Sequence, residues 1–431
     1  MREAFSTFTF ESQTVKREGG TLSLAFDFNL DDRYHFRPTL EIPARPFFDW
    51  DGIPEDQLQA LAFQIGMTEL VSYWKIACPK RVVVKPFALT EKQKAFWKKL
   101  YYNGLGEFLY LNSITVSEKD LMDIETLPID SMPSHILPGN DMGSWFEEKT
   151  LVPIGGGKDS VVTLECLRNA MPVTPLIVNP RGATLNCVKT AGYNDDEFIV
   201  INRTLDPTML KLNAEGYLNG HTPFSALLAF IGILVAFGSR SKYIALSNEN
   251  SANESTVPGT NINHQYSKSI EFESDFRNYV AENLNREVQY FSFLRPLSEL
   301  QIAKLFSECE AYHPVFRSCN AGSKTDSWCG KCPKCLFTWI ILSPFLSREK
   351  LVAIFGKDLM ADESLRPILE ELDGTAAVKP FECVGTVEEV QACMEAVKGN
   401  RQIVDGVLRR FNTHHFLPPR FEQILKSRLH V

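Results

Sequence analysis

Residues 150–160 read TLVPIGGGKDS, an apolar run that ends in three glycines and a Lys-Asp-Ser triplet. Residues 161–169 continue with helical spacing, so the segment predicts a buried strand, a tight loop and a helix. The glycines at 155–157 let the backbone approach a ligand closely, and the N–H groups at the start of the helix suit an anion, most often phosphate. This stretch therefore predicts an α/β fold with a phosphate-binding loop.

Three polar residues complete the loop. Lys158 can neutralise phosphate charge, and the hydroxyl of Ser160 can donate to a phosphate oxygen. The carboxylate of Asp159 beside a phosphate requires a cation, and Mg²⁺ is the natural one. We predict that Gly155, Gly156, Gly157 and these three residues bind a phosphate group, with Asp159 also holding Mg²⁺. A glycine-rich turn that merely closes a β–α unit is the alternative interpretation.

Two common nucleotide loops do not fit this sequence. The dinucleotide fingerprint G-x-G-x-x-G requires glycine where Ser160 stands, and the Walker loop requires Ser or Thr where Asp159 stands. The loop resembles that of the ATP pyrophosphatases, S-G-G-x-D-S, with Gly155 in place of the first serine. That resemblance implies cleavage of the α–β bond of ATP to give AMP and pyrophosphate.

The segments that follow extend the α/β pattern. Apolar runs separated by helices predict a parallel sheet covered on both faces. We predict a doubly wound sheet of the ATP-pyrophosphatase (adenine nucleotide alpha hydrolase-like) type with a helical C-terminal extension. Its later strands are predicted at Val173–Val178, Glu197–Ile201, Tyr243–Leu246 and Val288–Phe293, and a buried apolar helix at Phe224–Phe237.

Composition indicates the domain boundaries. Residues 1–126 mix alternating segments with segments of helical spacing, which predicts a smaller mixed α/β N-terminal domain. Residues 127–146 hold three prolines among Ser, Asp, Asn and Gly, a composition typical of a linker. The catalytic domain is predicted to run over 147–431, including a cysteine segment at 319–335 and a helical tail.

Polar residues follow several predicted strands. In an open α/β sheet, ligands bind beyond the carboxyl ends of the strands. Asn179 follows the second strand of the predicted domain, and Asn248 and Glu249 follow the fourth. In the ATP-pyrophosphatase fold the first and fourth strands are neighbours, so this resemblance places Asn248 and Glu249 opposite the glycine loop. We predict that these three residues contact the nucleotide.

Four of the ten cysteines fall within seventeen positions: Cys319, Cys329, Cys332 and Cys335. Four thiolates at such spacing suit a tetrahedral, closed and therefore structural Zn²⁺ site. Reduced cysteines without a metal are the alternative. The other six are scattered and are expected to pack as small apolar side chains. Cys383 stands apart because its turn-like neighbourhood, KPFECVG, mixes reactive residue types.

Composition restricts the classes of binding partner and the cellular compartment that we expect for this chain. The chain has 431 residues, a formal net charge of −8 and 44% hydrophobic residues, which excludes a largely disordered or fibrous protein. The negative net charge of the chain disfavours tRNA and other nucleic acids as binding partners. The first fifteen residues lack a signal-peptide pattern, and the apolar run at 224–237 falls short of the ~20 residues that span a bilayer. We predict a cytoplasmic enzyme without a membrane partner.

Several longer strings of the chain are distinctive. They are Tyr102–Phe108 (YNGLGEF), Val152–Ser160, Asn219–Pro223 (NGHTP), Ser247–Ala252 (SNENSA), Asn263–Ser269 (NHQYSKS), Phe291–Leu300 (FSFLRPLSEL), Trp328–Cys335 (WCGKCPKC) and Lys379–Gly385 (KPFECVG). Together these strings resemble one family, the bacterial UDP-N-acetylmuramoyl-L-alanyl-L-glutamate epimerases (MurL). The resemblance implies ATP-dependent inversion of the terminal L-Glu of this peptidoglycan precursor, through adenylation of its carboxylate with release of AMP and diphosphate.

An epimerase also needs groups that move the Cα proton. His221 and His264 lie in predicted loops on the ligand side, and we predict that they and Lys158 are catalytic. Tyr266, Lys268 and Cys383 are further candidates. Arg37, Arg181 and Arg203 can bind phosphate or carboxylate groups of the substrate.

Two other functions compete with this one. An ATP-pyrophosphatase loop with downstream cysteines also resembles the deazaguanine synthase of queuosine biosynthesis, a carboxylate-activating enzyme related to tRNA-modifying ones. A zinc-stabilised nucleotide-binding regulator without chemistry is the second rival. Pyrophosphate release with the muramoyl dipeptide separates all three.

Overall fold

The computed structural model describes residues 2–127, 132–133, 145–257, 260 and 262–429. Contacts between residues divide the chain into two compact units, and each unit is built from three separate stretches of the sequence. Unit 1 comprises residues 1–149, 199–244 and 271–290, and unit 2 comprises 150–198, 245–270 and 291–431. The units therefore interleave along the chain, whereas the predicted domains follow one another. Of the predicted linker 127–146, residues 128–131 and 134–144 lie outside the described residues.

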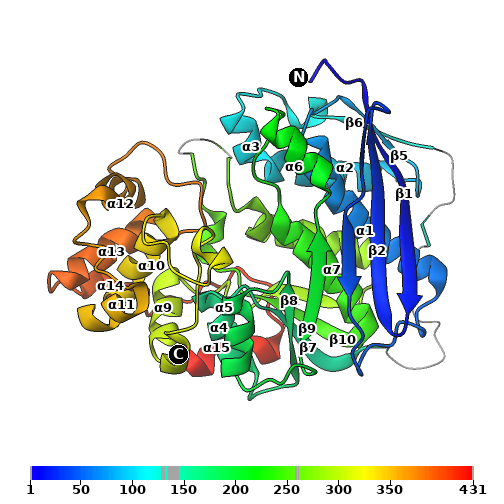
Figure 1. The fold of residues 1–431 in the computed structure, drawn as a ribbon. Coiled ribbons are helices and arrows are strands. Elements are labelled where there is room, and N and C mark those ends of the chain that lie inside the picture. Colours follow the sequence, from blue (N-terminus) through cyan, green and yellow to red (C-terminus); the bar gives the residue numbers. More distant parts are fainter. Residues whose placement is uncertain (1, 128–131, 134–144, 258–259, 261, 430–431) are drawn as a thin grey trace. The chain divides into compact units, whose positions relative to one another are not determined.

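Unit 1 is built around a long hairpin of β1 (Thr7–Glu18) and β2 (Thr21–Leu30), the two long arrows in blue in Figure 1. The strands pair antiparallel from Glu18↔Thr21 to Phe8↔Leu30. Gly19 and Gly20 turn the chain between them with φ of +57° and +80°, values that glycine adopts without a Cβ clash. Phe8, Phe10, Phe26 and Phe28 alternate with polar residues and supply the buried face.

Further strands flank this hairpin. The order within unit 1 is β9-β4-β2-β1-β5-β6, with β3 also on β2. β1 pairs parallel with β5, which pairs parallel with β6, whereas β4 pairs antiparallel with both β2 and β9. The bounds are β3 Tyr34–Phe36, β4 Thr39–Ile42, β5 Arg81–Val84, β6 Asp123–Thr126 and β9 Ile199–Thr204.

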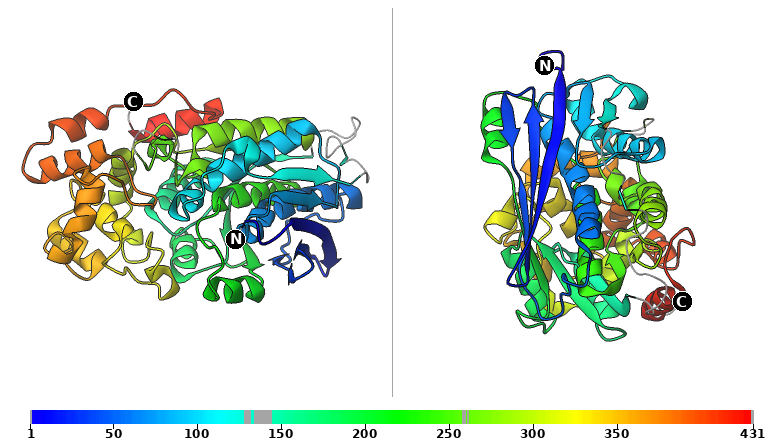
Figure 2. Two further views of the ribbon diagram at one scale, coloured as in Figure 1. Left: turned by 90° about the horizontal axis from the view of Figure 1, so that it is seen from above. Right: turned by 90° about the vertical axis from the view of Figure 1, so that its right-hand side faces the viewer.

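Helix α1 (Glu55–Trp74) covers one face of the hairpin, as the right-hand view of Figure 2 shows. Gly66 permits this approach, because a Cβ there would lie 2.4 Å from the Phe10 ring. The ring of Phe10 stacks on Phe63 of α1 with centroids 5.8 Å apart. Helix α7 (Phe224–Ser239) packs against α1 and is buried along most of its length, which confirms the predicted core helix. Among the described residues, no helix combines the length and the apolarity needed to cross a membrane.

Shorter helices complete unit 1. Thr90 and Gln93 form a reciprocal capping box at the start of α2, which fixes where that helix begins. The bounds are α2 Glu91–Gly104, α3 Gly106–Leu111, α6 Pro207–Ala214 and α8 Ile270–Asn283.

Unit 2 contains the strand, loop and helix that the glycine segment predicts. β7 (Glu147–Pro153) leads through the glycines into α4 (Lys158–Leu167), and β8 (Val173–Val178) returns parallel to β7. The strand order is β11-β10-β7-β8, so β7 lies beside β10 as expected. The other two strands, β10 Ser241–Leu246 and β11 Gln289–Ser292, each begin in residues of unit 1 and end in residues of unit 2.

The rest of unit 2 is helical, which confirms the predicted helical extension. Helices α9 and α15 pack against α4, and α10 packs against α9, α11, α12 and α13. The chain is therefore a mixed α/β protein of strands and covering helices. The helices of unit 2 after α4 are α5 Gly182–Thr190, α9 Glu299–Ser307, α10 Pro333–Leu342, α11 Arg348–Phe355, α12 Arg366–Asp373, α13 Val387–Val397, α14 Gln402–Val407 and α15 Pro419–Leu429.

Candidate functional site

The glycine loop of unit 2 has the backbone geometry of an anion site. Gly156 has φ +80°, and a Cβ there would lie 3.0 Å from the backbone of Ala183. Gly157 is the N-cap of α4 and carries no side chain to cap the helix, so the first N–H groups point to the space beyond it. A Cβ at Gly155 would meet nothing within 4 Å, so packing permits the serine of the ATP-pyrophosphatase pattern there.

The side chain of Lys158 is buried within unit 2. It is 3% exposed, and its ammonium pairs with Asp159 Oδ1 at 2.5 Å and with Glu299. Burial lowers the pKa of Lys158, but these two carboxylates outweigh burial and hold its pKa above the ordinary value. As placed, Lys158 anchors Asp159 and Glu299, and this geometry does not support the predicted direct role in proton transfer.

Asp159 is the exposed member of a carboxylate group in unit 2. Its side chain is 37% accessible, whereas Glu249 and Glu299 are buried. Burial, with Glu389 and Asp159 adding to it, raises the pKa of Glu249 to about 7. Burial also raises the pKa of Glu299 well above its ordinary range, against the opposing effect of Lys158. The group therefore carries more carboxylates than cations, an arrangement that suits a metal ion or another cationic partner.

Arg295 joins two segments beside this group. It is fully buried, and its guanidinium donates to the carbonyl of Glu249 at 2.5 Å and to the carbonyl of Lys268. Asn248 donates to Ser292 Oγ at 3.1 Å, which holds the same loop to β11. Asn248 and Glu249 were predicted at this edge, whereas Arg295 and Glu299 were not among the predicted site residues. Both stand in the string FSFLRPLSEL, and Arg295 also follows the fifth predicted strand.

The other predicted ligand-side residues of unit 2 are positioned by local backbone. Asn179 follows β8 with φ +53°, a left-handed conformation that asparagine tolerates. Arg181 is the N-cap of α5, where its backbone N–H donates to Thr184 Oγ1 at 2.9 Å. Ser160 donates to the carbonyl of Gly157 at 3.0 Å and so closes the first turn of α4. Asn179 and Ser160 thus lie where the nucleotide was predicted, one after β8 and one at the glycine loop.

A thiol, an ammonium and an imidazole meet elsewhere in unit 2. Lys268 Nζ lies 3.1 Å from Cys383 Sγ, and His264 also hydrogen-bonds to this sulfur. Burial by itself raises a thiol pKa, but Lys268, His264 and Lys334 together lower the pKa of Cys383 to about 5. The neighbouring ammonium groups and imidazole therefore favour the thiolate form of Cys383. The structure brings three of the predicted proton-transfer candidates into one cluster.

His221 belongs to unit 1. Its Nδ1 lies 3.9 Å from Glu107 Oε2, a residue of α3 that the sequence reasoning did not single out. The loop before it is held by Lys75, which donates to the carbonyl of Gly220. Burial, with Arg203 adding to it, lowers the pKa of Lys75 to about 8. Unit 1 thus has a partly buried polar group of its own around the NGHTP string.

Two arginines predicted to bind substrate are engaged with protein carboxylates in unit 1. Arg203 Nη2 lies 2.7 Å from Glu69 Oε2, and the Glu69 side chain is only 2% accessible. Arg37 pairs with Asp27 on the surface. This geometry favours a structural role for both arginines.

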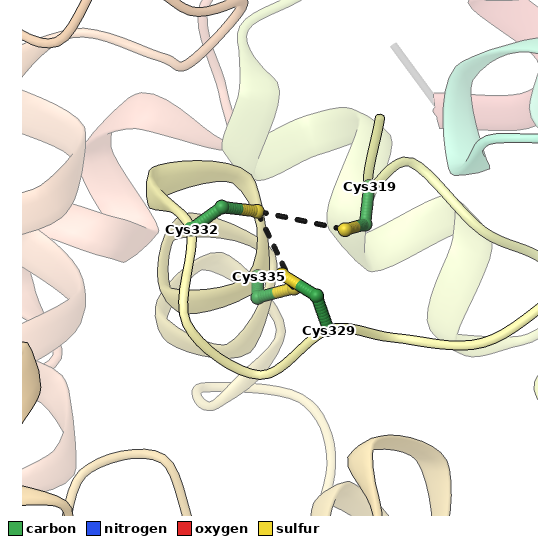
Figure 3. Close-up of side chains that lie close together, drawn as sticks. All are labelled: Cys319, Cys329, Cys332 and Cys335. Atoms are coloured by element: carbon green, nitrogen blue, oxygen red, sulfur yellow. Dashed lines mark hydrogen bonds between the residues drawn. The ribbon is translucent and has the colours of Figure 1, made fainter. Parts of the chain in front are cut away.

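The four clustered cysteines converge on one point, as Figure 3 shows. Cys332 Sγ lies 3.6 Å from Cys319 Sγ and 3.5 Å from Cys335 Sγ, and Cys329 and Cys335 are 3.7 Å apart. A tetrahedron with Zn–S bonds of about 2.3 Å has sulfur–sulfur edges of about 3.8 Å. The thiols thus fit a zinc ion, and the backbone N–H of Gly322 donates to Cys319 Sγ at 3.2 Å as an outer contact. All ten cysteines are free thiols.

This cysteine segment directly braces the glycine loop. The backbone N–H of Arg317 donates to the carbonyl of Gly156 at 2.7 Å. Ser318 Oγ lies 2.9 Å from where a Cβ of Gly157 would be. Cys319 comes next in the chain, so whatever fixes the four sulfurs also fixes the loop.

Comparison with known proteins agrees with the resemblance in the motifs. The MurL N-terminal domain matches residues 1–293, and the MurL C-terminal domain matches residues 315–415. The first therefore spans the glycine loop and the second the cysteine segment.

Three relatives named UDP-N-acetyl-alpha-D-muramoyl-L-alanyl-L-glutamate epimerase are similar over most of their length. The one from Micromonospora sp. is 36% identical over 89% of this chain and 84% of its own. That from Xanthomonas oryzae pv. oryzae is 31% identical over 95% and 90%, and that from Salinispora tropica 34% over 89% and 82%. The chain belongs to the MurL family.

Proposed function

We propose that this protein is an ATP-dependent epimerase that inverts the terminal L-Glu of UDP-N-acetylmuramoyl-L-alanyl-L-glutamate to D-Glu. The observation that carries the proposal is similarity to named epimerases over at least 89% of this chain, across both family domains. The product supplies peptidoglycan precursor synthesis. Because the reaction consumes ATP, we propose a cytoplasmic location, with no nucleic-acid or membrane partner.

The chemistry explains why ATP is needed. Removing the Cα proton beside a free carboxylate would build a dianion, which is very unfavourable. Adenylation of the carboxylate cancels its charge and provides an acyl group that delocalises the carbanion. Inversion follows when the proton leaves one face and another returns to the opposite face, after which water releases AMP.

The glycine loop supports the activation step. Gly155–Gly157 and the first turn of α4 offer N–H groups to the phosphates, and a doubly wound ATP-pyrophosphatase fold is the arrangement we propose for this part of the chain. Asp159 would hold Mg²⁺, since carboxylate oxygens suit this ion and the side chain remains 37% accessible. When bound, Mg²⁺ would neutralise charge on the leaving pyrophosphate. Asn179, Asn248 and Glu249 line the same edge of the strands in our proposal.

A zinc ion held by Cys319, Cys329, Cys332 and Cys335 would have no open position and therefore no part in the reaction. The sulfur spacings support this assignment, as does the link from Arg317 to Gly156. Zinc would keep the segment that braces the glycine loop in place.

The test is pyrophosphate release combined with chiral analysis of the recovered glutamate. The purified protein, ATP and Mg²⁺ should release AMP and pyrophosphate with the L-Glu dipeptide and convert it to the D-Glu form. The UDP-muramoyl monopeptide ending in L-Ala is the control and should release none. Inversion without ATP would refute adenylation, and turnover of a deazapurine carboxylate in place of the dipeptide would refute the epimerase.

A further inference from the structure

Cys383, Lys268 and His264 form a cluster that the activation step does not use. We propose that the Cys383 thiolate is the general base that removes the Cα proton of the activated glutamyl residue, with Lys268 and His264 holding it in place. This inference rests on the proposed function and assigns one face of its proton-transfer step.

The three groups differ in what they can do at neutral pH. Burial lowers the pKa of Lys268, but Cys383, Asp159 and Glu249 outweigh it and raise that pKa, so Lys268 keeps its proton and cannot act as a base. His264 is engaged in its hydrogen bond to the sulfur. The lowered pKa of Cys383 favours its thiolate form, and the residue as a whole is not fully buried. Of the three, it is the group that has an electron pair ready for a proton.

The cluster lies within electrostatic reach of the glycine loop. Asp159 and Glu249 both act on the pKa of Lys268, so the three charges share one region of unit 2. Arg295 makes the connection rigid, because the same guanidinium binds the carbonyls of Glu249 and Lys268. A substrate carboxylate activated at the loop would therefore be near the thiolate.

The loop that carries Cys383 is held from two sides. Lys379 pairs with Glu254 and also donates to the carbonyl of Gly385 at 2.9 Å. Lys334, from the first turn of α10, lies 3.4 Å from Glu382. Such support on both flanks is what a reacting group needs, since small displacements of a base reduce proton-transfer rates strongly.

The proton step balances as follows. The Cα–H bond breaks, a bond forms between this hydrogen and Cys383 Sγ, and the electron pair moves into the acyl carbonyl of the adenylate. An acid on the opposite face, exchangeable with water, then gives its proton to Cα. Exchange with solvent removes the proton from Cys383 and returns one to that acid, so both groups are restored.

The experiment separates adenylation from Cα chemistry. Exchange of labelled pyrophosphate into ATP reports the first, and incorporation of deuterium at Cα in D₂O reports the second. We expect Cys383→Ser to keep pyrophosphate exchange and to lose about 10²–10⁴-fold in deuterium incorporation. Cys309→Ser, a cysteine outside the cluster, should retain both reactions.

Each other outcome has a defined meaning. Absence of pyrophosphate exchange in the unmodified protein would refute the proposed function itself. Deuterium incorporation at the normal rate in Cys383→Ser, loss of both reactions in that variant, or a glutamyl thioester on Cys383 by mass spectrometry would overturn the general-base role. If the variant does not fold, stoichiometric alkylation of Cys383 in the unmodified protein, mapped by peptide mass spectrometry, must block deuterium incorporation and spare pyrophosphate exchange.

Lys268 is a positioning residue, so its test is a pH profile. The charged and titratable groups that face Cys383 are Lys268, His264 and Lys334. Removing the ammonium in Lys268→Met raises the thiol pKa toward its ordinary value, so the acidic limb of deuterium incorporation should move up by about two pH units or more. Lys268→Arg should restore most of the shift. An unmoved limb in Lys268→Met would overturn this part of the proposal.

Discussion

Each compact unit buries charged side chains, but unit 1 pairs its buried Glu69 with one arginine, whereas unit 2 gathers several carboxylates around fewer cations. Glu69 and Arg203 form a two-point ion pair with one contact at 2.7 Å, in which the Glu69 side chain is 2% and the Arg203 side chain 11% accessible. The nearby Lys75 donates to the carbonyl of Gly220, so it too is satisfied within the protein. In unit 1, protein groups therefore pair with each of these charged side chains.

Unit 2 contains two groups of acidic side chains that outnumber the cations beside them. Its carboxylate group has Asp159, Glu249, Glu299 and Glu389 against Lys158 and Arg295, and its four clustered thiols lie at zinc-site spacing. Excess buried charge is costly, and the raised pKa of Glu249 expresses that cost. The comparison indicates that unit 1 balances Glu69 with a side chain of its own, and in our proposal Mg²⁺ and zinc would supply the cations that unit 2 lacks.

The largest effect is expected at the cysteines. In Cys332→Ser we expect loss of one zinc equivalent by elemental analysis, because structural zinc contributes about 10–16 kcal/mol in isolated zinc-finger peptides. Hydrogen exchange should accelerate across residues 317–342 while peptides of unit 1 stay unchanged. The control Cys309→Ser should keep the metal. A variant equally protected without zinc would contradict the dependence of unit 2 on a cation.

The next largest effect tests whether the ion pair between Glu69 and Arg203 balances the buried charge of unit 1. Arg203→Met leaves Glu69 charged and buried, so the free energy of unfolding should fall by about 3–5 kcal/mol, measured by urea denaturation. The double variant Glu69→Leu/Arg203→Met should recover most of that loss. Arg81→Met removes an exposed ion pair and should leave the midpoint nearly unchanged. If the single and double variants are equally stable, the pair is not what balances this unit.

Asp159→Ala should affect catalysis and not stability. We expect AMP formation to fall by about 10²–10³-fold, since charge stabilisation at the phosphates is lost. The thermal midpoint should hold or rise, because one surplus carboxylate is removed. Glu165→Gln, in the same helix, is the control with normal AMP formation. Retained activity in Asp159→Ala would show that the glycine loop is not the ATP site.

The smallest effect is a pH dependence at Glu249. Without nucleotide or metal, this carboxyl is expected to ionise near 4.5 in the unfolded chain and near 7 in the folded protein. The folded state therefore loses stability as pH rises from about 4.5 to about 7, by up to about 3 kcal/mol. Denaturation at several pH values should show this slope in the unmodified protein and not in Glu249→Gln. The exposed Glu388→Gln should keep it, and parallel curves for all three would contradict the assignment.

Local patterns predicted many elements well. The strands at Val173–Val178 and Tyr243–Leu246 and the apolar helix at 224–237 appear within a few residues of the expected bounds. Each has strong apolar patterning that does not depend on distant partners. Strand β1 was not predicted, although Phe8 and Phe10 alternate with polar residues in it. Short alternation is a weak signal on its own, and β1 is defined as a strand by its pairing with β2 and β5.

Only some residues of the candidate site could be predicted from local patterns. The glycines, Asp159 and the four cysteines are recognisable because their chemistry depends on spacing within a few residues. Glu299 is not, because a glutamate in the first turn of a helix looks like a favourable dipole contact. Its ion pair with Lys158 spans 141 positions in the chain.

Residue patterns at short spacing were enough to predict the strand, loop and helix around the glycines, the cluster of four cysteines and the family resemblance. Backbone geometry alone sets the distances in such patterns. The folded arrangement was needed to show that Lys158 pairs with Glu299, that Arg203 pairs with Glu69 and that Cys383 contacts Lys268. Those outcomes depend on burial and on the balance of charges from distant segments, which no local pattern contains.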